Sequence, residues 1–75
     1  MDKITMEFAK ALKNLRIEKN LTQEELAQRS GVDYKYLQKL EGHTPSSPTL
    51  STLEKLANGL GITLVELIQS VQTNN

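Results

Sequence analysis

Four polar side chains near the middle of the chain have the types and spacing of a hydrogen-bonding surface: Tyr34, Lys35, Gln38 and Lys39. Residues four positions apart share one side of a helix, so a helix over this segment would present all four together. A lysine can donate to O6 and N7 of guanine, a glutamine can pair with N6 and N7 of adenine, and a tyrosine ring can contact a thymine methyl group or a phosphate. A helix over this segment would therefore present groups that can pair with the edges of DNA bases.

The same sequence gives little support for catalysis. It contains no cysteine and a single histidine, His43, which falls in an expected loop. The carboxylates mostly stand where they would cap helices, and the sequence has no glycine-rich phosphate-binding pattern. Without a nucleophile next to a base, we expect no enzyme. One histidine without acidic neighbours at ligand spacing predicts no metal site, and nothing in the sequence calls for a cofactor.

Two short helices joined by a tight turn are needed to position these side chains, and residues 22–42 predict them. Thr22 precedes a helical pattern and has Glu25 three residues later, which is the arrangement of a capping box. Gly31 can adopt the left-handed conformation that ends a helix. Asp33 is a suitable N-cap for the second helix, which carries the four polar side chains.

An ordered set of residues extends this pattern to most of the chain. It consists of Phe8, Leu12, Leu15, Arg16, Leu21 to Ala27, Ser30 to Val32, Tyr36, Leu37, Leu40 to Gly42, Pro48, Leu53, Leu56, Ala57, Leu60, Ile62 and Leu67. Over about residues 8–68 this set resembles the helix-turn-helix domains of the Cro and phage repressor type, the XRE family. The resemblance implies a compact all-α domain of five helices, similar to that of lambda repressor, with the helix over residues 33–41 in the major groove of double-stranded DNA.

The resemblance also implies which residues meet DNA. The four outward side chains of the helix over residues 33–41, the reading helix, would contact bases. Six residues would contact the DNA backbone: Thr22, Gln23, Tyr36, His43, Thr44 and Ser46. A plain surface role is the alternative for His43 and Gln23, and packing against a neighbouring helix is the alternative for the tyrosines. Asp33 is expected to cap its helix, with acceptance from N4 of cytosine as the alternative. Arg16 and Glu41 occupy positions that form an ion pair in related domains, and we expect the same pair here.

Three further helices are expected around the central pair. The first covers residues 5–19, with Thr5 or Asp2 as its cap. The stretch 43–48 reads as an exposed connector, because its prolines and small polar residues disfavour regular structure. The inner stripe of the first helix consists of Phe8, Leu12 and Leu15, and Ile4 can extend it. Thr49 caps the fourth helix, whose inner stripe consists of Leu50, Leu53, Leu56, Ala57 and Leu60.

The fourth helix contains a glycine that the sequence does not explain. Alanine in place of Gly59 would favour a helix by about 1 kcal/mol. Thr63 and Glu66 then form a second capping box, which predicts a fifth helix over about residues 64–71. The tail over residues 72–75 should be frayed.

The fifth helix carries more apolar surface than one small domain can bury. Leu64 and Leu67 can complete the core, which leaves Val65, Ile68 and Val71 to meet a partner. We therefore expect a two-fold homodimer on a near-palindromic site, with its reading helices about 34 Å apart. A monomer with a fully buried terminal helix is the alternative.

Length and charge bound the remaining possibilities. We expect one domain over residues 1–75, located in the cytoplasm, because no signal peptide and no apolar run of about 20 residues is present. Nine basic and nine acidic residues give no net charge, which lowers the expected nonspecific affinity for nucleic acid. The sequence predicts a sequence-specific regulator such as a phage repressor, a restriction-modification controller or an autoregulating antitoxin. The alternative is a protein-interaction module that uses the tyrosine-bearing helix.

Overall fold

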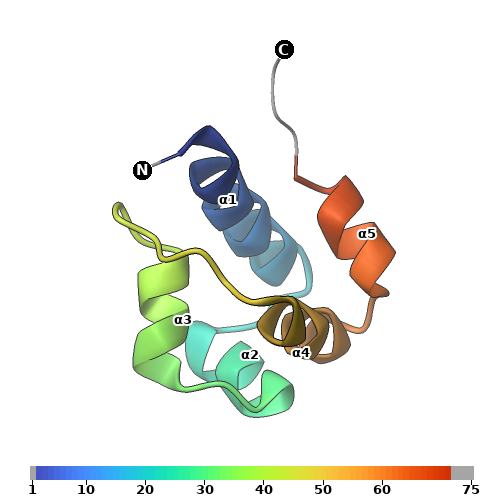
Figure 1. Ribbon diagram of the computed structural model, residues 1–75. Helices are drawn as coiled ribbons and strands as arrows, with labels where there is room; N and C mark the ends of the chain where they lie inside the picture. Colours follow the sequence, from blue (N-terminus) through green and yellow to red (C-terminus); the bar gives the residue numbers. More distant parts are fainter. Residues whose placement is uncertain (1, 72–75) are drawn as a thin grey trace.

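Five helices make up the part of the chain that the computed structural model describes, residues 2–71 (Figure 1). They are α1 (Lys3–Glu18), α2 (Gln23–Ser30), α3 (Tyr34–Leu40), α4 (Leu50–Leu60) and α5 (Leu64–Gln69). Residues 2–71 contain no strand, and none of their helices has the length and apolar character needed to cross a membrane. The expected five-helix, all-α fold is therefore confirmed.

Capping boxes fix the start of α2 and of α5. Thr22 Oγ1 accepts from the Glu25 backbone N–H at 3.0 Å, and Glu25 Oε1 accepts from the Thr22 backbone N–H at 2.8 Å. Thr63 and Glu66 make the same exchange at 3.0 and 2.9 Å. Because a backbone N–H donates to each ionised carboxylate, the pKa of Glu25 and that of Glu66 lie below their usual value.

The first helix begins earlier than the sequence predicts. Asp2 Oδ1 accepts from the Thr5 backbone N–H at 2.9 Å, so Asp2 is the cap and α1 starts at Lys3. Of the two predicted caps Thr5 is wrong, because it lies inside the helix and is buried. The extension of the inner stripe by Ile4 is also wrong, because Ile4 lies in the first turn of α1 and is 56% exposed.

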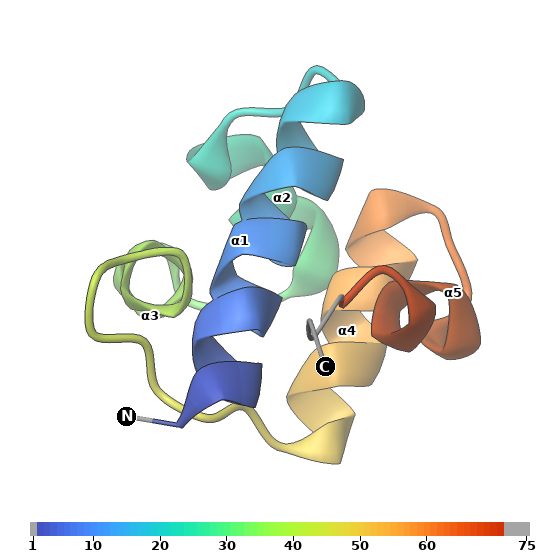
Figure 2. The ribbon, with the colours of Figure 1, turned by 90° about the horizontal axis from the view of Figure 1, so that it is seen from above.

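One hydrophobic core joins all five helices. Its largest fully buried side chains are Leu12, Leu26, Leu37, Leu40, Leu56 and Leu67, and every helix contributes at least one of them. α4 packs against both α2 and α5, and α3 packs against α2. Figure 2 shows α1 running between α3 on one side and α4 and α5 on the other. The core therefore holds α3 at one side of the domain and α5 at the opposite side.

Two expectations about packing are wrong. Leu50 does not face the core but is 75% exposed, because it is the first residue of α4 and burial on that helix begins one turn later, at Leu53. The connector over residues 43–48 is not exposed throughout, since Pro45 is buried and Ser46 is half-buried. Pro45 lines the same surface cavity as residues of α1, so the connector runs beside that helix.

The last helix ends sooner than expected. α5 stops at Gln69, and Ser70 caps it, with the Ser70 hydroxyl donating to the Leu67 carbonyl. Val71 follows as a half-buried residue that packs against the core. The predicted frayed tail, residues 72–75, lies outside the described residues.

Gly59 lies where α4 approaches α2 closely. A Cβ atom at this position would overlap Ser30 Oγ, and it would lie 3.1 Å from both Leu26 Cδ1 and Ser30 Cβ. Glycine therefore permits the approach of the two helices, at the cost in helix propensity noted above. The glycine that the sequence leaves unexplained is thus explained by its neighbour in space.

Candidate nucleic-acid interface

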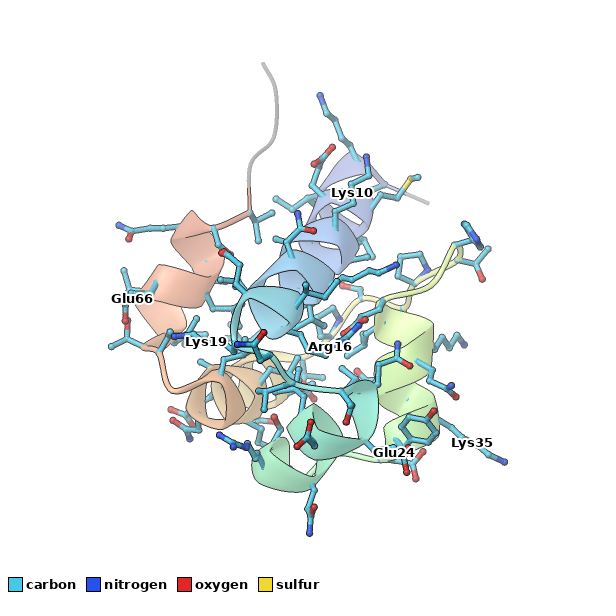
Figure 3. All side chains as sticks on the ribbon, turned by 180° about the vertical axis from the view of Figure 1, so that it is seen from behind. Lys10, Arg16, Lys19, Glu24, Lys35 and Glu66 are labelled. Carbon is cyan, nitrogen blue, oxygen red and sulfur yellow. The ribbon has the colours of Figure 1, made fainter. Side chains whose placement is uncertain are left out.

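The third helix buries one side and exposes the other. Leu37 and Leu40 are fully buried, and Asp33 Oδ2 caps the helix by accepting from the Tyr36 backbone N–H at 3.2 Å. The four polar side chains that the sequence singles out are all exposed: Tyr34, Lys35, Gln38 and Lys39. Figure 3 shows Lys35 extending away from the body of the domain. The structure therefore gathers these donors and acceptors on one helix whose position the core fixes.

Two of the four exposed side chains bond to each other. Gln38 Nε2 donates to the Tyr34 hydroxyl oxygen at 3.0 Å, across one turn of α3. Tyr34 is 39% exposed, so its ring stands at the surface and not in the core. Each group keeps hydrogen-bonding capacity beyond this bond, because a carboxamide has a second N–H and an oxygen, and a hydroxyl can still donate.

Tyr36 occupies a different environment from Tyr34. It is half-buried, and its side chain packs against the hydrophobic core. The alternative of packing against neighbouring helices therefore applies to the ring of Tyr36, and only its remaining surface is available to a ligand.

A buried polar network ties α3 to the two helices before it. Arg16 Nε and Nη2 donate to Glu41 Oε2 and Oε1 at 2.8 and 3.0 Å, and Arg16 Nη1 donates to the Leu21 carbonyl at 2.7 Å. Gln23 Nε2 also donates to Glu41 Oε1, at 3.2 Å. The predicted Arg16–Glu41 ion pair is thus present and bidentate. It lies mostly out of solvent, with 11% of the Arg16 side chain and 2% of the Glu41 side chain exposed.

This network fixes the side chain of Gln23. The residue is half-buried in the first turn of α2, next to the Thr22 cap. Its bond to Glu41 braces the end of α3 against the start of α2. The amide oxygen of Gln23 is not used in that bond and can accept a further hydrogen bond.

Acidic residues also stand at the start of α2. Glu24 and Glu25 belong to its first turn, and both are exposed. Their negative charges interact favourably with the positive end of the helix dipole, but they repel phosphates that approach Thr22 and Gln23. The interface therefore carries mixed charge, which lowers its nonspecific affinity for DNA.

The connector after α3 contributes a second polar region. His43 and Thr44 are exposed, while Ser46 is half-buried. A surface cavity of about 320 Å³ separates this connector from α1 and is lined in part by Lys10, Lys13 and His43. From the sequence alone, Lys10 and Lys13 could be either solvated surface residues or phosphate contacts, because nothing local in the sequence places the connector beside α1.

The expected dimer face lies on the other side of the domain. Val65 is 63% exposed and Ile68 is 48% exposed, whereas Val71 is half-buried against the core. Leu64 is half-buried and Leu67 is fully buried, which agrees with the prediction that these two residues complete the core. In Figures 1 and 2, α5 and α3 stand on opposite sides, so a partner on α5 would not cover the exposed side chains of α3.

Comparisons with known proteins agree with this geometry. The family described as helix-turn-helix matches residues 12–67. An uncharacterized HTH-type transcriptional regulator of Sinorhizobium fredii, y4dJ, is 50% identical over 54 residues, which are 72% of this chain and 69% of the regulator. The cryptic phage CTXphi transcriptional repressor RstR of Vibrio cholerae is 39% identical, over 89% of this chain and 60% of the repressor. The control protein C.MunI of a Mycoplasma species is 38% identical, over 96% of this chain and 97% of its own length.

Solved structures give the same fold. The protein C.Esp1396I bound to a 19 base pair DNA duplex superposes with a TM-score of 0.81 at 28% identity, covering 96% of this chain and 100% of that one. The restriction-modification controller protein C.AhdI from Aeromonas hydrophila has a TM-score of 0.78 at 36% identity, covering 84% of this chain and 94% of that one.

Proposed function

The chain belongs to the helix-turn-helix family, and from this premise we propose that it is a sequence-specific regulator of transcription that binds double-stranded DNA. The exposed polar side of α3 carries the proposal, because it stands on the same fold as a protein solved on a DNA duplex. A helix of this kind enters the major groove, where each base pair presents its own pattern of donors and acceptors. This role involves no chemical step and requires no cofactor.

The proposed contacts divide into two groups. Base edges would be met by Tyr34, Lys35, Gln38 and Lys39, and the DNA backbone by Thr22, Gln23, Tyr36, His43, Thr44 and Ser46. The placement of Gln23 supports its role, because one N–H of its carboxamide donates to Glu41 and the second N–H can donate to a phosphate oxygen. Contacts to the backbone set the register of the protein on DNA, and contacts to the bases set its preference.

The regulator would act as a two-fold homodimer. Val65 and Ile68 would meet their counterparts, since exposed large apolar side chains are typical of an interface. Val71 would add only the part of its surface that the core leaves uncovered. Pairing through α5 leaves both copies of α3 free, which suits two half-sites about one helical turn, or 34 Å, apart. The operator would then be near-palindromic.

Among regulatory roles, we favour that of a controller of a restriction-modification system. This chain covers 94% of the restriction-modification controller protein C.AhdI and 97% of the control protein C.MunI, whereas it spans 60% of the phage repressor RstR. A regulator must share a compartment with its operator, so we propose a cytoplasmic location.

Selection of duplexes from a randomised pool by the purified protein tests the proposal. We expect one near-palindromic sequence to be enriched, and its binding to weaken linearly in a plot of log affinity against log salt, because neutralised phosphates release counterions. Recovery of no preferred sequence, together with salt-insensitive capture of a partner protein, would replace this function with that of a protein-interaction module.

A further inference from the structure

The hydrogen bond between Tyr34 and Gln38 distinguishes these two side chains from the lysines beside them. Both residues are exposed, yet Gln38 Nε2 donates to the tyrosine hydroxyl at 3.0 Å without help from any buried group. Asp33 caps the turn that carries Tyr34, and Leu37 anchors the next turn in the core. The backbone on which this pair is built is therefore held at both ends.

The bond restricts the carboxamide of Gln38. A free glutamine at the surface samples several rotamers and both orientations of its amide, and it must give up that freedom when it pairs with a base. With one N–H held by Tyr34, the second N–H and Oε1 remain. These are the donor and the acceptor that bidentate pairing with N7 and N6 of adenine requires.

We propose that Tyr34 is a positioning residue that orients Gln38 for an adenine in each half-site, so that the pair sets the preference at one base pair. This inference rests on the proposed function and assigns Tyr34 a role through Gln38 in place of a direct contact with a base.

Tyr34→Phe tests the assignment, because it retains the ring and removes only the accepting oxygen. We expect the preference for adenine at the Gln38 position to weaken by roughly two- to tenfold, the range that corresponds to the ordering of one side chain. Affinity for duplexes of unrelated sequence should change by less than about twofold, since the phosphate contacts remain. Tyr36→Phe is the matched control, because it removes a hydroxyl from a tyrosine on the same helix. As a proposed contact to the DNA backbone, Tyr36 should affect all duplexes by a similar factor, and its replacement should leave the preference at this base pair unchanged.

A double-mutant comparison separates positioning from direct contact. Gln38→Ala should remove the preference at the same base pair, and adding Tyr34→Phe to it should change that preference no further. If Tyr34→Phe instead alters a different base pair, or if its effect adds in full to that of Gln38→Ala, the assignment is overturned while the proposed function stands. If the wild-type protein shows no base preference at all, the proposed function and this inference both fail.

Nuclear magnetic resonance of the free protein provides a readout that does not depend on DNA. The side-chain amide resonances of Gln38 should shift in Tyr34→Phe and should stay in place in Tyr36→Phe. Unchanged Gln38 resonances in Tyr34→Phe would also overturn the inference.

Discussion

Replacing Glu41 with alanine should destabilise the domain far more than removal of an exposed charge does. The Glu41 carboxylate accepts two bonds from Arg16 and one from Gln23, and only 2% of its side chain is exposed. Without it, a guanidinium that is 11% exposed loses its counter-charge but stays buried. Loss of one partner from a buried pair costs about 3 to 5 kcal/mol. Because Arg16 keeps its bond to the Leu21 carbonyl, we expect a cost at the low end, about 3 kcal/mol.

Urea denaturation of a double-mutant cycle measures the changes in the free energy of unfolding, and thermal unfolding of the same variants measures the Tm. In a domain of this size about 1 kcal/mol lowers the Tm by about 4 to 8 °C, so Glu41→Ala should lower it by about 12 to 24 °C. The cycle of Arg16→Ala and Glu41→Ala should give a coupling free energy of about 2 kcal/mol.

The Glu7–Lys10 pair of α1 is the matched control for this cycle. Its charged atoms are 3.9 Å apart and the Lys10 side chain is 71% exposed, so its coupling should lie below about 0.5 kcal/mol. If the coupling between Arg16 and Glu41 is no larger than that between Glu7 and Lys10, the buried network does not hold α3 as described.

Three further predictions concern packing, pH and assembly. Gly59→Ala should destabilise the domain by about 1 to 2 kcal/mol although alanine favours a helix, and adding Ser30→Ala should recover part of the loss. A Gly59→Ala variant that is more stable than wild type in thermal unfolding would contradict the close approach of α4 to α2. Folding lowers the pKa of Glu25, so the stabilisation from this carboxylate is present above its ordinary pKa of 4.5 and is lost as the pH falls through the lowered pKa. The difference in unfolding free energy between wild type and Glu25→Ala should therefore shrink in that pH window, and a constant difference would refute the role of the capping box. Ile68→Asp should yield a monomer in sedimentation experiments and Ile17→Asp, at a position on α1 that is also exposed, should not, whereas an unchanged oligomeric state in Ile68→Asp would exclude the proposed face.

Local signals allowed much of the fold to be predicted from the sequence. The cap at Thr22, the turn at Gly31, the cap at Asp33 and the box at Thr63 each depend on residues three or four positions apart, so the sequence itself displays them. The outward side of α3 follows in the same way from helical periodicity. The position of the Arg16 partner, by contrast, came from resemblance to a family, because the two charges are far apart in the chain.

Features that depend on distant neighbours escaped prediction. The reason for Gly59 is Ser30, on another helix, and the burial of Pro45 depends on where the connector returns to α1. Leu50 matches the apolar period of α4 but lies at its exposed end, which periodicity cannot reveal. The bond between Tyr34 and Gln38 has the spacing of an i, i+4 pair, so a search of α3 for such pairs could have found it.

Binding to a panel of single-base variants of the selected operator tests the central claim most directly, namely that the exposed side of α3 reads sequence. Lys35→Ala and Gln38→Ala should each lose roughly 1 to 3 kcal/mol on the preferred site and relax the preference at particular base pairs. Gln23→Ala should weaken binding to every duplex in the panel by a similar factor, because it would remove a contact to the DNA backbone. An unchanged base preference in both Lys35→Ala and Gln38→Ala would contradict the claim and would place other residues in the groove.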